Sequence, residues 1–70
     1  MNGYENKITW EMALLMNNDY GIYHRIQGDS DPFGKEDICD ILSDHLDWDE
    51  MENGANWNEI FEVVKEIQGK

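Results

Sequence analysis

The chain has few basic residues. It contains five Lys and Arg against sixteen Asp and Glu, which gives a formal net charge of −11 over 70 residues. Nucleic acids and anionic lipids attract proteins mainly through Lys and Arg, so an acidic chain is repelled by both. We therefore expect no direct binding of DNA or RNA and no binding to a membrane surface.

Cysteine and long apolar runs are scarce as well. Cys39 is the only cysteine, which excludes an internal disulfide and any zinc site that needs two cysteines. No segment approaches the roughly 20 apolar residues that a membrane-spanning helix needs, and residues 1–10 lack the basic and apolar parts of an export signal. The expected location is a reducing cytoplasm.

The residues that are present predict one small folded domain over residues 1–70. Hydrophobic residues make up 40% of the chain and include three Trp, more than a disordered acidic tail would carry. A chain of this length buries only about 60% of the surface that it exposes when unfolded, so its core must be small. A homodimer is an open alternative to the monomer.

Helix caps and apolar spacing predict an all-α domain of three to four short helices, because no segment alternates as a strand does. The first helix is expected to start at Thr9 as N-cap and to end near Asn17. The second is expected to run from the cap Asp19 to Gly28. Their predicted buried residues are Trp10, Ala13, Leu14, Met16, Tyr20, Tyr23 and Ile26.

After a loop at residues 28–34, a third helix is predicted over about 35–47 and a turn over 50–55. Asn56 and Glu59 resemble a capping box, which starts a last helix that runs to about Gln68. The apolar residues of these two helices are Ile38, Ile41, Leu42, His45, Leu46, Ile60, Phe61, Val64 and Ile67. The histidine is expected to lie in or beside the core.

The acidic residues are concentrated between Glu36 and Glu52, where eight carboxylates occur without a Lys or Arg. On a single helix the steps of three, four and three from Asp37 to Asp47 would place four carboxylates on one face. Like charges at this spacing destabilise a helix by a few tenths of a kcal/mol per pair, so a role in binding is indicated. The candidate partner-binding residues are Asp37, Asp40, Asp44, Asp47, Asp49, Glu50, Glu52, Glu59, Glu62 and Glu66.

Two roughly parallel rows of carboxylates could imitate the phosphates of DNA and bind the basic groove of a nucleic-acid-binding protein. One alternative is a solvated face that only keeps the protein soluble. Another is an adaptor that binds through Tyr4, Trp10 and Tyr20, because aromatic residues are frequent at the energetic centres of interfaces.

The N-terminal third carries a motif that can be compared with known proteins. It consists of residues 4–10 (YENKITW), Ala13-Leu14 and residues 18–23 (NDYGIY). This motif resembles the N-terminal signature of a family of small proteins found in phages, plasmids and bacterial genomes. The resemblance implies a mobile-element accessory protein in the bacterial cytoplasm. It favours a DNA mimic that inhibits a host nuclease, a restriction enzyme or a nucleic-acid-binding regulator.

Metal binding and catalysis receive less support. Five residues have the spacing of a calcium loop, although Phe33 stands at a ligand position and Pro32 stiffens the loop. These residues are Asp29, Asp31, Gly34, Asp37 and Asp40. A second group, Asp47, Asp49, Glu50 and Glu52, could hold a divalent cation weakly. Cys39 and His45 are expected on different helix faces, so they make no nucleophile pair. We expect no cofactor and no enzymatic activity.

Overall fold

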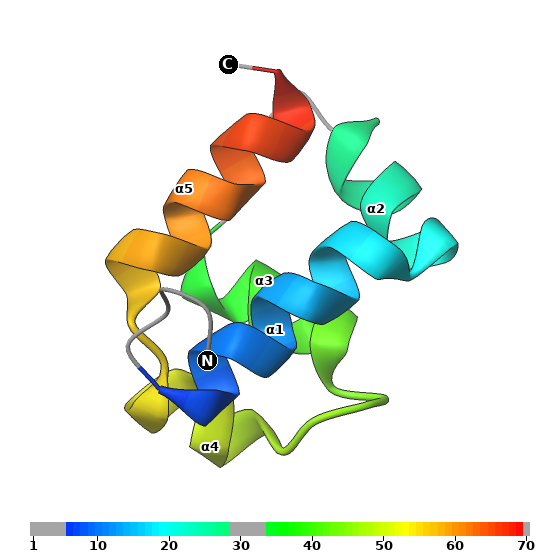
Figure 1. The fold of residues 1–70 in the computed structure, drawn as a ribbon. Coiled ribbons are helices and arrows are strands. Elements are labelled where there is room, and N and C mark those ends of the chain that lie inside the picture. Colours follow the sequence, from blue (N-terminus) through cyan, green and yellow to red (C-terminus); the bar gives the residue numbers. More distant parts are fainter. Residues whose placement is uncertain (1–5, 29–33, 70) are drawn as a thin grey trace.

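Helices account for all the regular structure that the computed structural model describes, which covers residues 6–28 and 34–69 (Figure 1). The described helices are α1 (Lys7–Asn18), α2 (Tyr20–Gln27), α3 (Lys35–Leu42), α4 (Trp48–Gly54) and α5 (Trp57–Gln68). The predicted all-α class is confirmed. The predicted number of three to four helices is too low by at least one, because residues 48–54 form a helix of their own.

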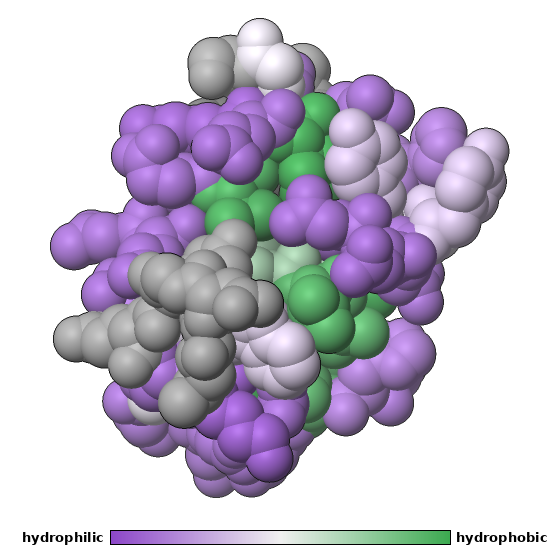
Figure 2. Space-filling model, viewed as in Figure 1, coloured by the Kyte–Doolittle hydropathy of each residue, from purple (hydrophilic) through white to green (hydrophobic). Residues whose placement is uncertain are grey.

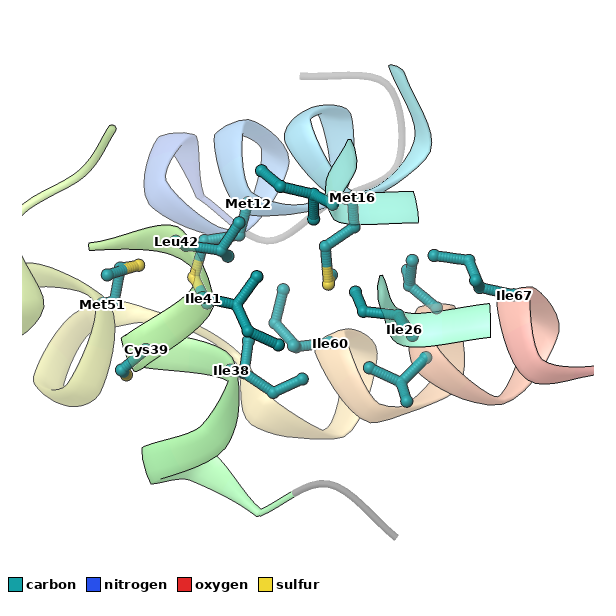
Figure 3. Packing of buried hydrophobic residues seen from close by; sticks show 14 of the residues in the cluster. Met12, Met16, Ile26, Ile38, Cys39, Ile41, Leu42, Met51, Ile60 and Ile67 are labelled. Atoms are coloured by element: carbon teal, nitrogen blue, oxygen red, sulfur yellow. The ribbon is translucent and has the colours of Figure 1, made fainter. Parts of the chain in front are cut away.

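The helices pack around one apolar core. In Figure 1, α1 crosses in front of α3, with α5 on one side and α2 on the other. The first helix packs on α2, α4 and α5, while α3 packs most closely on α4. Ile60 lies near the middle of the core, beside Ile38 and Ile41 of α3 (Figure 3). The completely buried apolar residues come from all of these helices: Met12, Met16, Ile26, Ile38, Cys39, Leu42, Met51 and Ile60.

Several predicted core positions are correct and others are not. Ala13, Met16, Ile26 and the apolar residues predicted for α5 are buried, except that Phe61 is only partly buried. In α1 the buried stripe follows Ile8, Met12 and Met16 at steps of four, so Trp10 is half-buried and Leu14 is 44% exposed. Tyr20 is 79% exposed, because Ile22 and Ile26 form the buried side of α2 instead.

The predicted third helix ends five residues early, at Leu42. The hydroxyl of Ser43 donates a hydrogen bond to the Asp40 carbonyl at 2.9 Å. Such a local bond competes with continued helix. The chain then turns and restarts at the N-cap residue Asp47. As a result His45, which was predicted to lie in the apolar arc, is exposed on the turn, with Nε2 at 3.9 Å from Asp19 Oδ2.

The short helix α4 was predicted as a turn. Met51 is completely buried and anchors this helix to the core, and Trp48 is partly buried and also packs against the core. Helices of seven residues are unstable alone and form in proteins through packing of their apolar side. The apolar residues at positions 48 and 51 therefore decide the structure of this segment.

A hydrogen-bond network joins the starts of α1 and α5. The N-cap of α1 is Asn6, not Thr9 as predicted, and its Oδ1 accepts bonds from the N–H and the hydroxyl of Thr9 at 3.0 and 2.6 Å. The completely buried Thr9 hydroxyl also accepts the N–H of Asn56 at 2.8 Å, across 47 residues of sequence. Asn6 Nδ2 donates to the Gly54 carbonyl at 2.7 Å. Thr9 thus connects two helix caps.

Replacing Thr9 with valine should lower the free energy of unfolding by about 1 to 3 kcal/mol. Valine has nearly the same shape as threonine, but it lacks the buried hydroxyl that donates one hydrogen bond and accepts another. Urea denaturation followed by far-UV circular dichroism measures this loss. Thr9→Ser keeps the hydroxyl and removes one buried methyl, which should cost about 0.8 kcal/mol. A valine variant more stable than the serine variant would contradict the role of the hydroxyl.

Candidate functional site

The predicted binding residues are almost all on the surface. Nine of the ten side chains are exposed, and Glu59 is half-buried. Asp37 and Asp40 lie on α3, Asp44 lies in the following turn, Asp47 is the N-cap residue of α4, and α4 carries Asp49, Glu50 and Glu52. We call these seven residues the α3–α4 acidic segment. Glu59, Glu62 and Glu66 lie on α5.

The predicted row of four carboxylates on one helix face is wrong. The row assumed that a single helix continues through residue 47, whereas α3 ends at Leu42. Only Asp37 and Asp40 share a helix, whereas Asp44 lies in the turn and Asp47 is the N-cap residue of α4. The structure therefore distributes the α3–α4 acidic segment over two short helices and the turn between them.

The acidic helices α3 and α5 also do not run in parallel. Their axes run in clearly different directions in both Figure 1 and Figure 3. The N-terminal end of α3 lies near that of α5, where Lys35 Nζ lies 5.6 Å from the centre of a Trp57 ring. The closest packing of α3 is with α4, and that of α5 is with α1 and α2. The two roughly parallel rows that were expected to imitate DNA are therefore not formed.

Some carboxylates stabilise their own helices. Asp37 Oδ2 accepts the Gly34 N–H at 2.9 Å at the start of α3, and Asp49 and Glu50 occupy the first turn of α4. Negative charges near a helix N-terminus are favourable, typically by about 0.3 to 1 kcal/mol. These three residues thus have a structural reason to be acidic. Asp40 and Asp44 lie outside the first turn of a helix, so this reason does not apply to them.

Basic side chains do not neutralise the α3–α4 acidic segment. In the described part of the chain, none of its seven carboxylates forms an ion pair with Lys or Arg, and the Lys ion pair found there joins Lys7 to Glu11 at 3.6 Å. On α5, Lys65 accompanies three carboxylates, whereas on α3 and α4 together Lys35 accompanies six. Negative charge is therefore less compensated on α3 and α4 than on α5.

Neither a metal centre nor a reactive thiol is assembled from the residues described. No group of three or more His, Cys, Asp or Glu among them is placed to hold a metal ion, and this includes the predicted group from Asp47 to Glu52. Asp29 and Asp31 of the predicted calcium loop lie outside the described residues. Burial raises the pKa of the Cys39 thiol, and the negative charge of Glu52 adds to this effect while Lys35 opposes it. Cys39 is thus a protonated core residue.

Trp10 and Tyr20, the two described members of the proposed aromatic patch, form no ring contact with each other. Tyr20 is exposed, and its ring centre lies 4.2 Å from that of His24 one turn later on α2. Trp10 is half-buried on α1, and Tyr4 lies outside the described residues. Tyr20 is therefore the member of this patch that is exposed among the described residues, and it forms an aromatic pair with His24, which was not part of the prediction.

A groove between α1 and the turn after α3 was not found by sequence reasoning. Its volume is about 470 Å³, and it is lined by Glu11, Leu14, Leu15, Asn18, Asp19, His45 and Leu46. The adjacent leucines at 14 and 15 did not indicate it, because adjacent apolar residues can also both lie in the core, as Val63 and Val64 do. The other wall is formed by the turn after α3, and this turn depends on contacts between distant segments that a local sequence pattern does not show.

The comparisons with known proteins add no identification: no family model, curated protein or solved structure matches this chain. The resemblance of residues 4–23 to a family of phage, plasmid and bacterial proteins therefore stays a prediction. Within residues 6–28 and 34–69, no helix has the length and apolar character needed to cross a membrane.

Proposed function

We propose that this protein is a non-enzymatic binding module whose α3–α4 acidic segment docks on the basic surface of another protein. The supporting observation is the set of seven exposed or helix-capping carboxylates from Asp37 to Glu52, which lack Lys or Arg partners within the described residues. Complementary charge of this kind speeds association and selects the partner.

The partner class that fits best is a protein with a nucleic-acid-binding surface, because such surfaces use Lys and Arg to contact phosphates. In its more specific form, the protein is a mobile-element inhibitor that occupies the nucleic-acid site of a host nuclease, restriction enzyme or regulator. Since α3 and α5 do not run in parallel, we place the main contacts on α3, the turn and α4, with Glu59, Glu62 and Glu66 outside the central footprint.

A salt-graded pull-down tests this proposal. The tagged protein is incubated with a bacterial lysate freed of nucleic acid, and the resin is washed at low salt and then at about 0.5 M salt, where the Debye length falls to roughly 4 Å. We expect a nucleic-acid-binding protein that is retained at low salt and released by the second wash. If the resin retains no basic protein at low salt, the docking proposal is wrong.

A second candidate function is an adaptor that binds through exposed aromatic residues. It is favoured by Tyr20, which is 79% exposed and lies against His24. Aromatic contacts are screened by salt much less than contacts between exposed charges. A partner that survives the 0.5 M wash and is lost with Tyr20→Ala would therefore support the adaptor instead of the acidic surface.

A further inference from the structure

The groove between α1 and the turn after α3 has an apolar floor. Leu15 and Leu46 are partly buried and pack on the core, while Leu14 is 44% exposed. Figure 2 shows apolar surface over the middle of α1, framed by hydrophilic residues. A volume of about 470 Å³ lies within the range of roughly 300 to 1,000 Å³ that is usual for ligand pockets. The groove is thus large enough to receive several apolar atoms of a partner.

The rim of the groove is acidic. Glu11 lies on one wall, and its carboxylate is 3.6 Å from the exposed Lys7 ammonium group. Asp19 also lines the groove; its Oδ1 accepts the Ile22 N–H at 3.1 Å and its Oδ2 lies 3.9 Å from His45 Nε2. His45 and Leu46 stand between Asp44 and Asp47 in the sequence, so the groove adjoins the α3–α4 acidic segment.

The charge of the rim limits which molecule can occupy the groove. A second copy of this chain would bring another net charge of −11 towards it, which opposes self-association. An apolar anion such as a fatty acid would meet Glu11 and Asp19. A cationic segment with apolar side chains satisfies both the leucine floor and the acidic rim.

We propose that this groove binds an amphipathic helix of the partner that presents leucine-like side chains flanked by Lys or Arg. This inference rests on the proposed function and adds an apolar anchor to the basic partner. Recognition of a helix in a groove works through side chains spaced by three and four residues, which fill the apolar floor. The anchor would cover Leu14, and the flanking cations would face Glu11, Asp19 and the α3–α4 acidic segment.

Two synthetic helical peptides of about 14 residues test the groove. One has leucines at spacings of three and four on one side and lysines elsewhere, and the other has alanine in place of each leucine, so both have the same charge and high helix propensity. Isothermal titration calorimetry at low salt measures both affinities. We expect the leucine peptide to bind at least about tenfold more tightly, because burying one leucine side chain contributes about 1.5 to 3 kcal/mol and tenfold corresponds to about 1.4 kcal/mol.

Leu14→Gln should reduce this tenfold difference to about twofold and leave the affinity for the alanine peptide unchanged, since glutamine keeps helix propensity and removes the apolar contact. Tyr20→Gln is the matched control, because Tyr20 is the other exposed large hydrophobic residue among those described and does not line the groove. The control should keep the full difference.

Each other result overturns the inference in a distinguishable way. Equal affinity for both peptides refutes binding of a helix in the groove, but it leaves the proposed docking through the α3–α4 acidic segment unaffected. Binding of neither peptide refutes the proposed function as well. If only Tyr20→Gln abolishes the difference in affinity between the two peptides, the leucine side chains bind at the pair formed by Tyr20 and His24 and not in the groove. A dimer in sedimentation that disappears with Leu14→Gln would assign the groove to a second copy of this chain.

Discussion

Replacing both Asp40 and Asp44 with lysine should weaken binding of the salt-sensitive partner by at least about a hundredfold. The two substitutions change the net charge from −11 to −7 and place like charges against a basic surface, an arrangement that costs several kcal/mol. A hundredfold loss corresponds to about 2.7 kcal/mol. Calorimetry or surface plasmon resonance with the partner recovered from the pull-down measures the effect.

The helices should survive this change. Both side chains are exposed, and the Asp40 contact that ends α3 is made by its backbone carbonyl, which lysine also has. A lysine at position 40 would follow Glu36 by four residues, a favourable spacing for opposite charges. Far-UV circular dichroism should therefore show unchanged helix content.

A matched control separates the site from the overall charge. Glu62→Lys with Glu66→Lys changes the net charge by the same four units at exposed positions of α5. We expect the control to weaken binding by less than about tenfold, through long-range charge alone. An equal loss in both double variants would contradict the placement of the contacts on the α3–α4 acidic segment, and no loss in either would refute the acidic surface as the binding site.

The features that the sequence predicts correctly are those encoded within a few residues. Asp19 accepts the Ile22 N–H at the start of α2, and Asn56 accepts the Glu59 N–H at the start of α5, as their spacing indicated. Such caps depend on side chains that bond to the backbone three residues away. The all-α class and the apolar face of α5 follow from equally local patterns.

The features that were missed depend on contacts between distant segments. Thr9 could cap a helix locally, but its hydroxyl donates to the cap residue Asn6 and accepts the backbone N–H of Asn56, which is 47 residues away. The spacing from Ile38 to Leu46 fits one long helix, and the burial of Met51 on the other side of a turn replaces it with two short ones. The predicted acidic row depended on that long helix, so the same error affected the candidate site.

Truncating Ile60 to alanine should have the largest effect on stability. Ile60 is completely buried and lies near the middle of the core in Figure 3, where it neighbours Ile38 and Ile41. Such truncations lower the free energy of unfolding by about 2 to 5 kcal/mol. A domain of this length has a total stability of roughly 4 to 10 kcal/mol, so this single truncation should remove a large share of it. Urea denaturation followed by circular dichroism measures the change.

Leu14→Ala is the matched control, because it removes an aliphatic side chain that is 44% exposed on α1. Its free energy of unfolding should change by about 0.5 kcal/mol or less, since surface substitutions have small effects and alanine favours helix. Equal destabilisation by both variants would contradict the assignment of the core. If the two variants differ in stability as expected, Leu14→Ala stays folded, so weaker binding of the leucine peptide to this variant reports on the groove itself. Weaker binding to Ile60→Ala would report only on unfolding.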